Sequence, residues 1–173
     1  MITPASQRYV ALFLAAADLS QAKTIVELGS GTGAVTEKIL ENKPKDSLFF
    51  SMEINKEFIA MTKKRCHRAI VYHDSALHLK KYLHQHHVRS CDIVISTLPL
   101  GGWKKDAQEK MLDTIHDTLS PKGKLFIGAY LHALLFNRGR NLCALLHEKF
   151  HTIRKTKTTF ASFPPALVYC CQK

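Results

Sequence analysis

The feature that most constrains the fold of this chain is a run of three glycines at alternate positions, Gly29, Gly31 and Gly33. It follows residues 24–28, a short apolar run typical of a buried strand, and it precedes residues 34–42, which have the pattern of a helix. Glycine allows positive φ angles and lets a ligand approach the backbone closely at the start of a helix. The sequence therefore predicts a strand–turn–helix unit that binds a small molecule.

Strand and helix patterns alternate along almost the whole chain, which predicts an α/β fold with a mostly parallel sheet. Helices are expected over residues 6–19, 34–42, 55–66, 75–87, 104–119 and 141–150, and strands over residues 24–28, 47–53, 69–73, 91–96, 124–130, 152–160 and 166–171. Ser6 and Asn55 are expected to cap helices, residues 121–123 to form a turn, and residues 162–165 to connect a final hairpin. The 173 residues contain no repeat and no linker composition, so a single domain is predicted.

Two acidic residues define the turn further. The spacing of the glycines is G-x-G-x-G, which differs from the G-x-G-x-x-G of dinucleotide-binding folds, and Glu27 precedes the first glycine by two residues. Glu53 ends the second predicted strand, twenty residues after Gly33, where an acidic side chain can bind the hydroxyls of a ribose. The ligand is therefore expected to carry a ribose but need not carry a pyrophosphate.

These residues resemble those of the class I S-adenosylmethionine-dependent methyltransferases, and the resemblance extends over nearly the whole chain. It implies a Rossmann-like sheet of seven strands with helices on both faces, whose last strands form an antiparallel hairpin. The resemblance implies that the methionine part of the cofactor is held by Glu27, Gly29, Ser30, Gly31 and Gly33. It also implies that Glu53 binds the ribose and that Asp74, followed by Ser75 and Ala76, receives the adenine amino group. Asp74 could instead be only the N-cap of the helix that follows.

A narrower resemblance concerns the methyl acceptor. Residues 3–6 (Thr-Pro-Ala-Ser), residues 96–100 (Ser-Thr-Leu-Pro-Leu) and residues 163–169 (Phe-Pro-Pro-Ala-Leu-Val-Tyr) are similar to segments of the bacterial phospholipid N-methyltransferases. Members of that family often have Gly-Pro-Gly where this chain has Gly29-Ser30-Gly31. The resemblance implies that the acceptor is a phosphatidylethanolamine-type amine and that a substrate loop is formed by Thr97, Leu98, Pro99 and Leu100.

Two other functions are compatible with the same turn. RNA adenine N6-methyltransferases, including those of rRNA, usually have Asn-Leu-Pro-Tyr or a similar sequence after the fourth strand, where an amide holds the target amino group and a ring stacks on the base. Here Thr97 and Leu100 replace the amide and the ring, which disfavours a nucleobase acceptor. The other function is that of a cofactor-binding module that performs no turnover.

Catalytic candidates follow from the chemistry of methyl transfer to an amine. The amine must lose a proton before it attacks, and Tyr130 and His132, at and just beyond the end of the fifth predicted strand, are candidate bases. The methylated product is a cation, which the aromatic faces of Trp103 and Tyr130 could stabilise. For each of these three residues, packing or a surface hydrogen bond is the alternative role.

The charge of the chain indicates polyanionic partners. Lys and Arg number 25 against 14 Asp and Glu, which gives a net charge of +11 with neutral histidines. Basic clusters at residues 63–68, 80–81 and 154–157 could contact an anionic membrane, a phospholipid substrate or RNA. Either partner, or only a solvated surface, would account for this composition.

Cysteine usage and apolar content indicate where the protein acts. Five cysteines without a CxxC pair favour a reduced, cytoplasmic protein, and no secretory signal is visible. The longest apolar stretch, residues 9–17, is about half the length that crosses a bilayer, so any membrane association is expected to be peripheral, on the inner face. Residues 84–87 (His-Gln-His-His) have no acidic or cysteine partner at metal-ligand spacing, so no metal site is expected.

Overall fold

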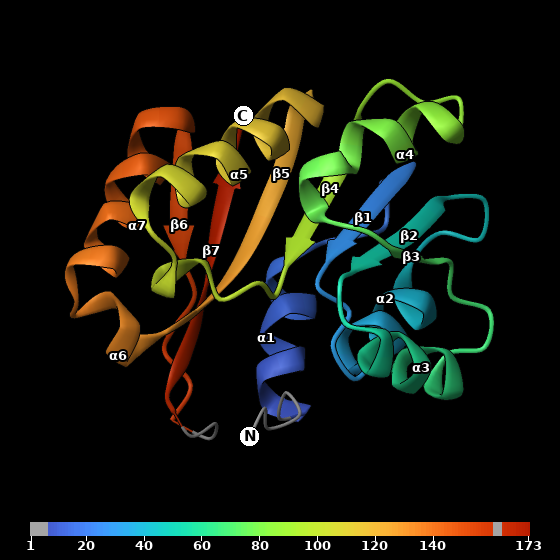
Figure 1. Ribbon diagram of the computed structural model, residues 1–173, viewed down its shortest axis with the longest axis horizontal. Coiled ribbons are helices and arrows are strands. Elements are labelled where there is room, and N and C mark those ends of the chain that lie inside the picture. Colours follow the sequence, from blue (N-terminus) through green and yellow to red (C-terminus); the bar gives the residue numbers. More distant parts are fainter. Residues whose placement is uncertain (1–6, 161–163) are drawn as a thin grey trace.

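The computed structural model describes residues 7–160 and 164–173, and its described part forms one sheet between two layers of helices (Figure 1). The seven strands are β1 (Thr24–Leu28), β2 (Leu48–Glu53), β3 (Val71–His73), β4 (Cys91–Ser96), β5 (Leu119–Tyr130), β6 (Thr152–Lys155) and β7 (Ala166–Gln172). They lie in the order β3-β2-β1-β4-β5-β7-β6; the first five are parallel, and β7 is antiparallel to both of its neighbours. The predicted Rossmann-like sheet with a final antiparallel hairpin is confirmed.

Helices cover both faces of this sheet. They are α1 (Gln7–Ala16), α2 (Ala34–Asn42), α3 (Lys56–Arg65), η1 (Ala76–His78), α4 (Leu79–Gln85), η2 (Leu100–Gly102), α5 (Lys105–Thr118), α6 (Leu131–Leu134) and α7 (Asn137–Lys149). Asn55 caps α3 as predicted, because its side chain accepts hydrogen bonds from the amides of Glu57 and Phe58. Ser6 and the segment of residues 3–6 lie outside the described residues.

The apolar core is divided in two by the sheet. On one face, α1 and α2 bury a cluster that includes Phe13, Ile25 and Ile39. On the other face, α4, α5 and α7 bury a larger cluster that includes Leu83 and Leu112. All five residues of β1 are buried, as expected for a parallel strand that is covered on both faces. The sheet is therefore rigid in the region where the glycine turn leaves it.

The hairpin side of the sheet differs most from the sequence prediction. Residues 121–123 do not form a turn before β5; the strand begins at Leu119, and residues 120–123 lie opposite the single residue Asp92 of β4. Within this irregularity, Asp92 accepts a hydrogen bond from the Ser120 hydroxyl at 3.2 Å. The strand predicted over residues 152–160 is regular only over β6. Beyond β6 its pairing with β7 is interrupted where the amide of Val168 donates to the Thr156 hydroxyl, and it resumes as a single antiparallel bridge between Thr159 and Ala166. The predicted connection over residues 162–165 lies partly outside the described residues.

Two helical features were also mispredicted. The prediction contained no helix at α6, and it placed the start of α7 at residue 141, four residues too late. Gly139 is unfavourable inside a helix, but here a Cβ would lie 2.2 Å from the carbonyl oxygen of Ala133, so only glycine lets α7 pack against α6. The helix predicted over residues 75–87 is divided into η1 and α4 and ends at Gln85.

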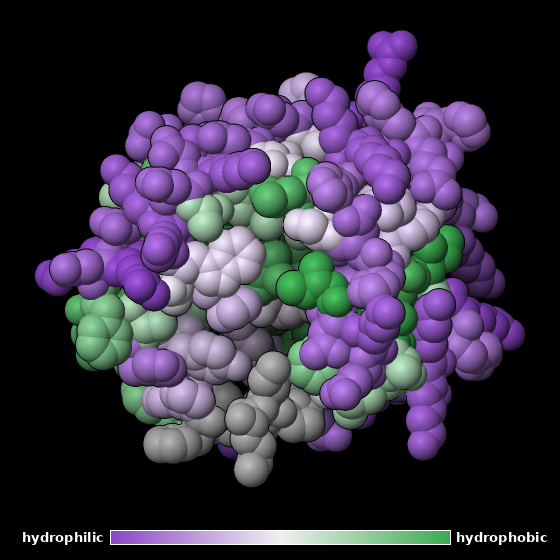
Figure 2. Space-filling model, viewed as in Figure 1, coloured by the Kyte–Doolittle hydropathy of each residue, from purple (hydrophilic) through white to green (hydrophobic). Residues whose placement is uncertain are grey.

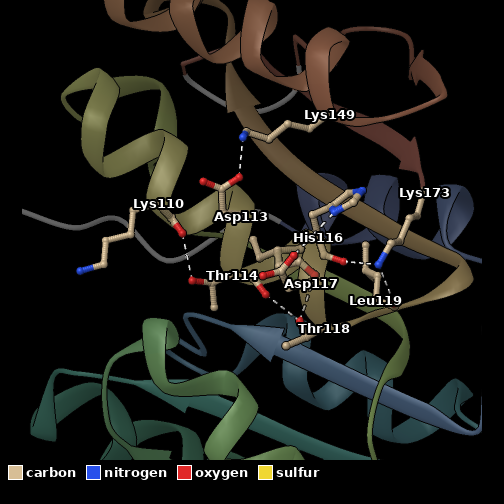
Figure 3. A network of polar contacts seen from close by, with 10 residues as sticks. Lys110, Asp113, Thr114, His116, Asp117, Thr118, Leu119, Lys149 and Lys173 are labelled. Atoms are coloured by element: carbon tan, nitrogen blue, oxygen red, sulfur yellow. Dashed lines mark hydrogen bonds and ion pairs between the residues drawn. The ribbon is translucent and has the colours of Figure 1, made fainter.

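Polar contacts at the amino ends of the strands tie α5 to the end of the chain (Figure 3). The Lys149 ammonium of α7 is ion-paired with Asp113 of α5. The Lys173 ammonium donates to the carbonyl oxygens of His116 at 2.7 Å and Leu119 at 3.1 Å. A cation thus provides a hydrogen-bond donor for the carbonyl groups at the carboxyl end of α5. These contacts stabilise the amino ends of the parallel strands, whereas the glycine turn lies at the carboxyl ends.

Replacing Gly128 of β5 by alanine is expected to disturb the packing of α1. A Cβ at this position would lie 1.7 Å from Tyr9 Oη and 2.9 Å from Phe13 Cζ, so these two buried rings of α1 would have to shift and their packing on the sheet would be disturbed. We expect a loss of about 1–3 kcal/mol or more in the free energy of unfolding, measured in urea. Gly102→Ala is the control, because its Cβ would meet nothing within 4 Å. Equal unfolding midpoints for Gly128→Ala and the wild type would contradict this docking of α1.

Candidate active site

The glycine turn lies at the carboxyl end of β1, between β2 and β4, where parallel sheets of this kind bind their ligands. Gly29, Gly31 and Gly33 all have positive φ angles, +85°, +52° and +82°. A Cβ at Gly31 would meet nothing within 4 Å, whereas a Cβ at Gly33 would lie 3.0 Å from the Cα of Thr62. Gly33 is thus required for packing, and Gly31 leaves the backbone open to a ligand.

Thr62 of α3 contacts the glycine turn through its hydroxyl group, and the sequence analysis did not predict this contact. The side chain is fully buried, and Oγ1 lies 2.9 Å from the carbonyl oxygen of Gly31 and 3.1 Å from Ser30 Oγ. The only sequence signal is a small hydroxyl residue within an otherwise basic helix segment. Ser30 uses its hydroxyl in this contact and is itself buried.

Glu27 lies beneath the turn and is completely buried. One carboxylate oxygen, Oε2, accepts hydrogen bonds from Thr36 Oγ1 of α2, at 2.6 Å, and from the Ser51 hydroxyl of β2. The other oxygen, Oε1, accepts none from the described residues. Burial raises the pKa of Glu27 from its ordinary value of 4.5 to about 7, although the two hydroxyl donors act in the opposite direction.

Glu53 ends β2 beside the turn, as the spacing predicts. Its Oε2 accepts a hydrogen bond from the amide of Gly31 at 3.1 Å, and its Oε1 accepts from the amides of Ile54 and Asn55. Two carboxylate oxygens offer about four acceptor positions, so one of them stays available for a hydroxyl donor. The structure thus brings the predicted ribose-binding residue against the predicted methionine-binding turn.

Asp74 follows β3 and is held more firmly than the sequence indicates. Its carboxylate accepts from the Ser75 amide at 2.7 Å, His78 Nδ1 at 2.7 Å, Tyr82 Oη at 2.8 Å and Lys81 Nζ at 3.4 Å. The hydrogen bond from His78 is the main reason why the pKa of Asp74 lies well below its usual range. An adenine amino group would have to replace one of these four donors, so the assignment of Asp74 to adenine stays a prediction.

The two residues after Asp74 have local roles. Ser75 caps η1, because its hydroxyl accepts from the amide of Leu77 at 3.3 Å, and Ala76 is buried. Their predicted contact with the cofactor therefore stays a prediction.

The predicted substrate loop lies directly against the glycine turn. Thr97 Oγ1 donates to the carbonyl oxygen of Gly29 at 2.5 Å, and a Cβ at Gly29 would lie 3.1 Å from the Leu98 side chain. Leu100 is fully buried, and its carbonyl oxygen accepts from the buried amide of Gln108. Two segments that lie far apart in the sequence therefore form one site.

A comparison with known families identifies the domain that contains this turn. A family model described as "Methyltransferase domain" matches residues 25–123, from β1 into β5, which is more than half of the chain. The chain belongs to this methyltransferase family. It is an S-adenosylmethionine-dependent enzyme, as the glycine turn and Glu53 led us to expect.

Individual relatives of this methyltransferase are distant. An ornithine lipid N-methyltransferase from Singulisphaera acidiphila is 25% identical over 158 residues, which cover 87% of this chain and 76% of that protein. The crystal structure of TrmN from Thermus thermophilus superimposes with a TM-score of 0.71 at 12% identity; the match covers 96% of this chain but only 49% of the other. An rRNA methylase from Streptococcus thermophilus has a TM-score of 0.67 at 17% identity, over 99% of this chain and 98% of the other. At these identities the two structures establish the fold.

The residues of the site fit S-adenosylmethionine. Gly31 leaves space for close approach, Glu27 Oε1 is a buried acceptor without a donor among the described residues, and Glu53 retains an acceptor position for a ribose hydroxyl. The cofactor supplies a methyl group that is already activated by the sulfonium. The protein therefore needs mainly to bind the cofactor and orient the acceptor.

The three predicted catalytic side chains are not all brought together. Tyr130 stacks on His132 and on Tyr9 of α1, with ring centroids 5.9 Å apart in both pairs. Trp103 packs against the larger core cluster, on the face of the sheet that α1 does not cover. Among the described residues, it makes no ring contact with Tyr130. Burial raises the pKa of Tyr9, so its phenol stays protonated near neutral pH. Tyr9, Tyr130 and His132 thus form one stack of rings at the end of β5, and the predicted catalytic roles of Trp103, Tyr130 and His132 stay predictions.

Residues 7–160 and 164–173 contain no group of three or more His, Cys, Asp or Glu side chains placed to hold a metal ion. None of the helices in this part of the chain combines the length and the apolar content needed to cross a bilayer.

Alanine substitutions at Gly31 and Gly33 are expected to separate binding from folding. Gly31→Ala meets no neighbour, so it should cost only about 1–2 kcal/mol of stability from its positive φ angle while abolishing close approach of the cofactor. Gly33→Ala carries the same backbone cost and also clashes with Thr62, so it should lower the melting temperature further. Calorimetric titration with S-adenosylmethionine and thermal unfolding measure the two effects. Unchanged cofactor affinity in Gly31→Ala would contradict the assignment of the turn.

Glu27 is expected to make the stability of the cofactor-free protein fall as the pH rises. Its pKa is about 7 in the folded protein and near 4.5 when unfolded, so the native state binds the proton more tightly. The stability that protonated Glu27 contributes is therefore fully present below pH 4.5 and is lost as the pH passes 7, by up to about 3 kcal/mol.

Urea unfolding at pH 5 and pH 8 tests this prediction. Relative to wild type, Glu27→Gln should gain stability between the two pH values, whereas Glu57→Gln, at an exposed site, should not. The same pH dependence in all three proteins would show that Glu27 does not titrate in this range.

Proposed function

We propose that this methyltransferase transfers methyl groups to the amine of a membrane-lipid headgroup, of the phosphatidylethanolamine type, at the cytoplasmic face of an anionic membrane. The observation that carries the proposal is the substrate loop. Thr97 Oγ1 donates to the backbone of the glycine turn, and the neighbouring Leu98 and Leu100 are apolar. The loop therefore presents neither a side-chain amide nor an aromatic ring for a nucleobase. The ornithine lipid N-methyltransferase, whose name specifies an amine-bearing lipid, supports the same class of acceptor.

The proposed reaction depends on position more than on acid–base strength. Bound S-adenosylmethionine would supply a sulfonium methyl group to a neutral acceptor amine, and the positive charge would pass from the cofactor to the methylated nitrogen. In this proposal the exposed ring of Tyr130, which is fixed by its stack on Tyr9, stabilises that cation, an effect of about 0.5–2 kcal/mol. His132, which is exposed beside Tyr130, accepts the proton that the ammonium form must lose.

RNA methylation is the second candidate, because the net charge of +11 also suits a polynucleotide. The likeness to TrmN and to an rRNA methylase concerns the fold, and the substrate loop offers no base-binding group. A cofactor-binding module without turnover is the remaining alternative. A single assay distinguishes all three.

The assay follows labelled methyl groups from S-adenosylmethionine into three acceptors: phosphatidylethanolamine in mixed micelles, ornithine lipid in mixed micelles, and protein-free ribosomal RNA. We expect label in lipid, most in phosphatidylethanolamine, with Gly31→Ala as the inactive control. Label in RNA but in neither lipid would overturn the proposal. A protein that binds S-adenosylmethionine but labels none of the three acceptors would favour the cofactor-binding module without turnover.

A further inference from the structure

A large groove lies beside β6 and β7, away from the cofactor turn. It has a volume of about 970 Å³, is open to solvent, and is bounded by α6 and α7 on one side and by residues 153–158 on the other. Its apolar lining includes Leu131, Leu134, Ile153 and Leu167. The polar atoms of the lining residues Cys143 and Tyr169 lie 3.0 Å apart and pair with each other, so they add little polarity to the floor. A groove of this kind suits a long apolar chain.

Cations border this floor. Lys155 and Lys157 line the groove and are exposed, and neither forms an ion pair with another described residue. Acidic groups are scarce around them, because residues 124–173 contain eight Lys and Arg but a single acidic residue, Glu148. The groove is therefore open to a ligand that combines an apolar chain with an anionic group.

Exposed apolar side chains flank the groove on both sides. Leu135 and Phe136, directly after α6, are 73% and 65% exposed, and Phe160, beyond β6, is 76% exposed. Figure 2 shows hydrophobic side chains at the surface over α6, on the left of the view, next to strongly hydrophilic ones. Large apolar side chains next to cations are the composition that binds at a lipid–water interface.

We propose that this groove and its flanks form a docking site for an anionic phospholipid in a membrane surface. The acyl chain lies on the leucine floor, the phosphate lies between Lys155 and Lys157, and the flanking apolar side chains enter the interface. Leu131 directly follows Tyr130, so docking in this orientation brings the membrane next to the end of β5. This docking site rests on the proposed function, because it would hold the enzyme at the membrane that contains its lipid substrate. RNA could use the same cations, but it would leave the leucine floor and the exposed side chains without partners.

The first test is sedimentation with vesicles of phosphatidylcholine, with or without phosphatidylglycerol; neither lipid carries a methylatable amine. We expect the wild type to sediment only with the anionic vesicles. The double variants Leu135→Ser/Phe136→Ser and Lys155→Gln/Lys157→Gln should each lose about tenfold or more in affinity, since each lysine near an anionic surface contributes about 1 kcal/mol. The matched controls are Met61→Ser/Ile70→Ser and Lys45→Gln/Lys56→Gln. They change exposed apolar and basic residues on the β2–β3 side of the sheet, outside the groove, and should bind like the wild type.

A second measurement uses only the wild-type protein. Amide hydrogen exchange should slow in α6, at the start of α7 and in residues 152–160 when anionic vesicles are added, and it should not slow in α3. Slower exchange in these segments with RNA and not with vesicles would overturn the proposal. So would a failure of the wild type to bind vesicles, or groove variants that bind as well as the controls.

Methyl transfer to a short-chain phosphatidylethanolamine below its micelle concentration separates the two proposals. Wild type and groove variants should methylate this monomeric lipid at similar rates, because no membrane surface is involved. Vesicle binding without methylation of any lipid would overturn the proposed function and leave the docking site supported. Methylation of the monomeric lipid without vesicle binding would overturn the docking site alone.

Discussion

The hydrogen bonds to one buried carboxyl group hold together the elements that form the cofactor site. Glu27 of β1 accepts from Thr36 at the start of α2 and from Ser51 of β2, so it joins both ends of the glycine turn to the neighbouring strand. Burying a carboxyl group costs free energy unless donors compensate. The two hydroxyl groups do so for Oε2 only, and Oε1 accepts no hydrogen bond from the described residues. The turn, α2 and β2 are therefore joined by a carboxyl group whose burial is only partly compensated.

The remainder of the chain is arranged around this turn as two unlike halves. The half from β1 to β4 carries the turn, Glu53 and the substrate loop, and it corresponds to most of the family match over residues 25–123. The half from β5 to β7 carries most of the excess positive charge and the most exposed aromatic side chains. Tyr130 stands where the two halves meet, stacked on α1. The glycine turn and the predicted substrate loop thus lie in one half of the sheet, and most of the positive charge lies in the other.

Features that depend on neighbouring residues could be predicted from the sequence, and features that depend on tertiary packing could not. The strands up to β4, the glycine turn and the cap at Asn55 follow from neighbouring residues, so periodicity and turn chemistry revealed them. Thr62 could not be found in this way, because its contact with Gly31 depends on how α3 packs beneath the turn. The start of α7 was missed for a related reason: Gly139 disfavours a helix locally, and only its close approach to α6 shows why it is there. The donors around Asp74 likewise come together only when η1 and α4 form.

The two edges of the sheet have a consequence for the protein in concentrated solution. An exposed strand edge can pair with the edge of another molecule and start aggregation. Here one outer strand, β3, has three residues and the other, β6, has four, and β6 carries the adjacent cations Arg154 and Lys155. Short edges with like charges repel a second copy before backbone hydrogen bonds can form. The protein can therefore expose apolar side chains beside β6 without offering that strand as a template for stacking.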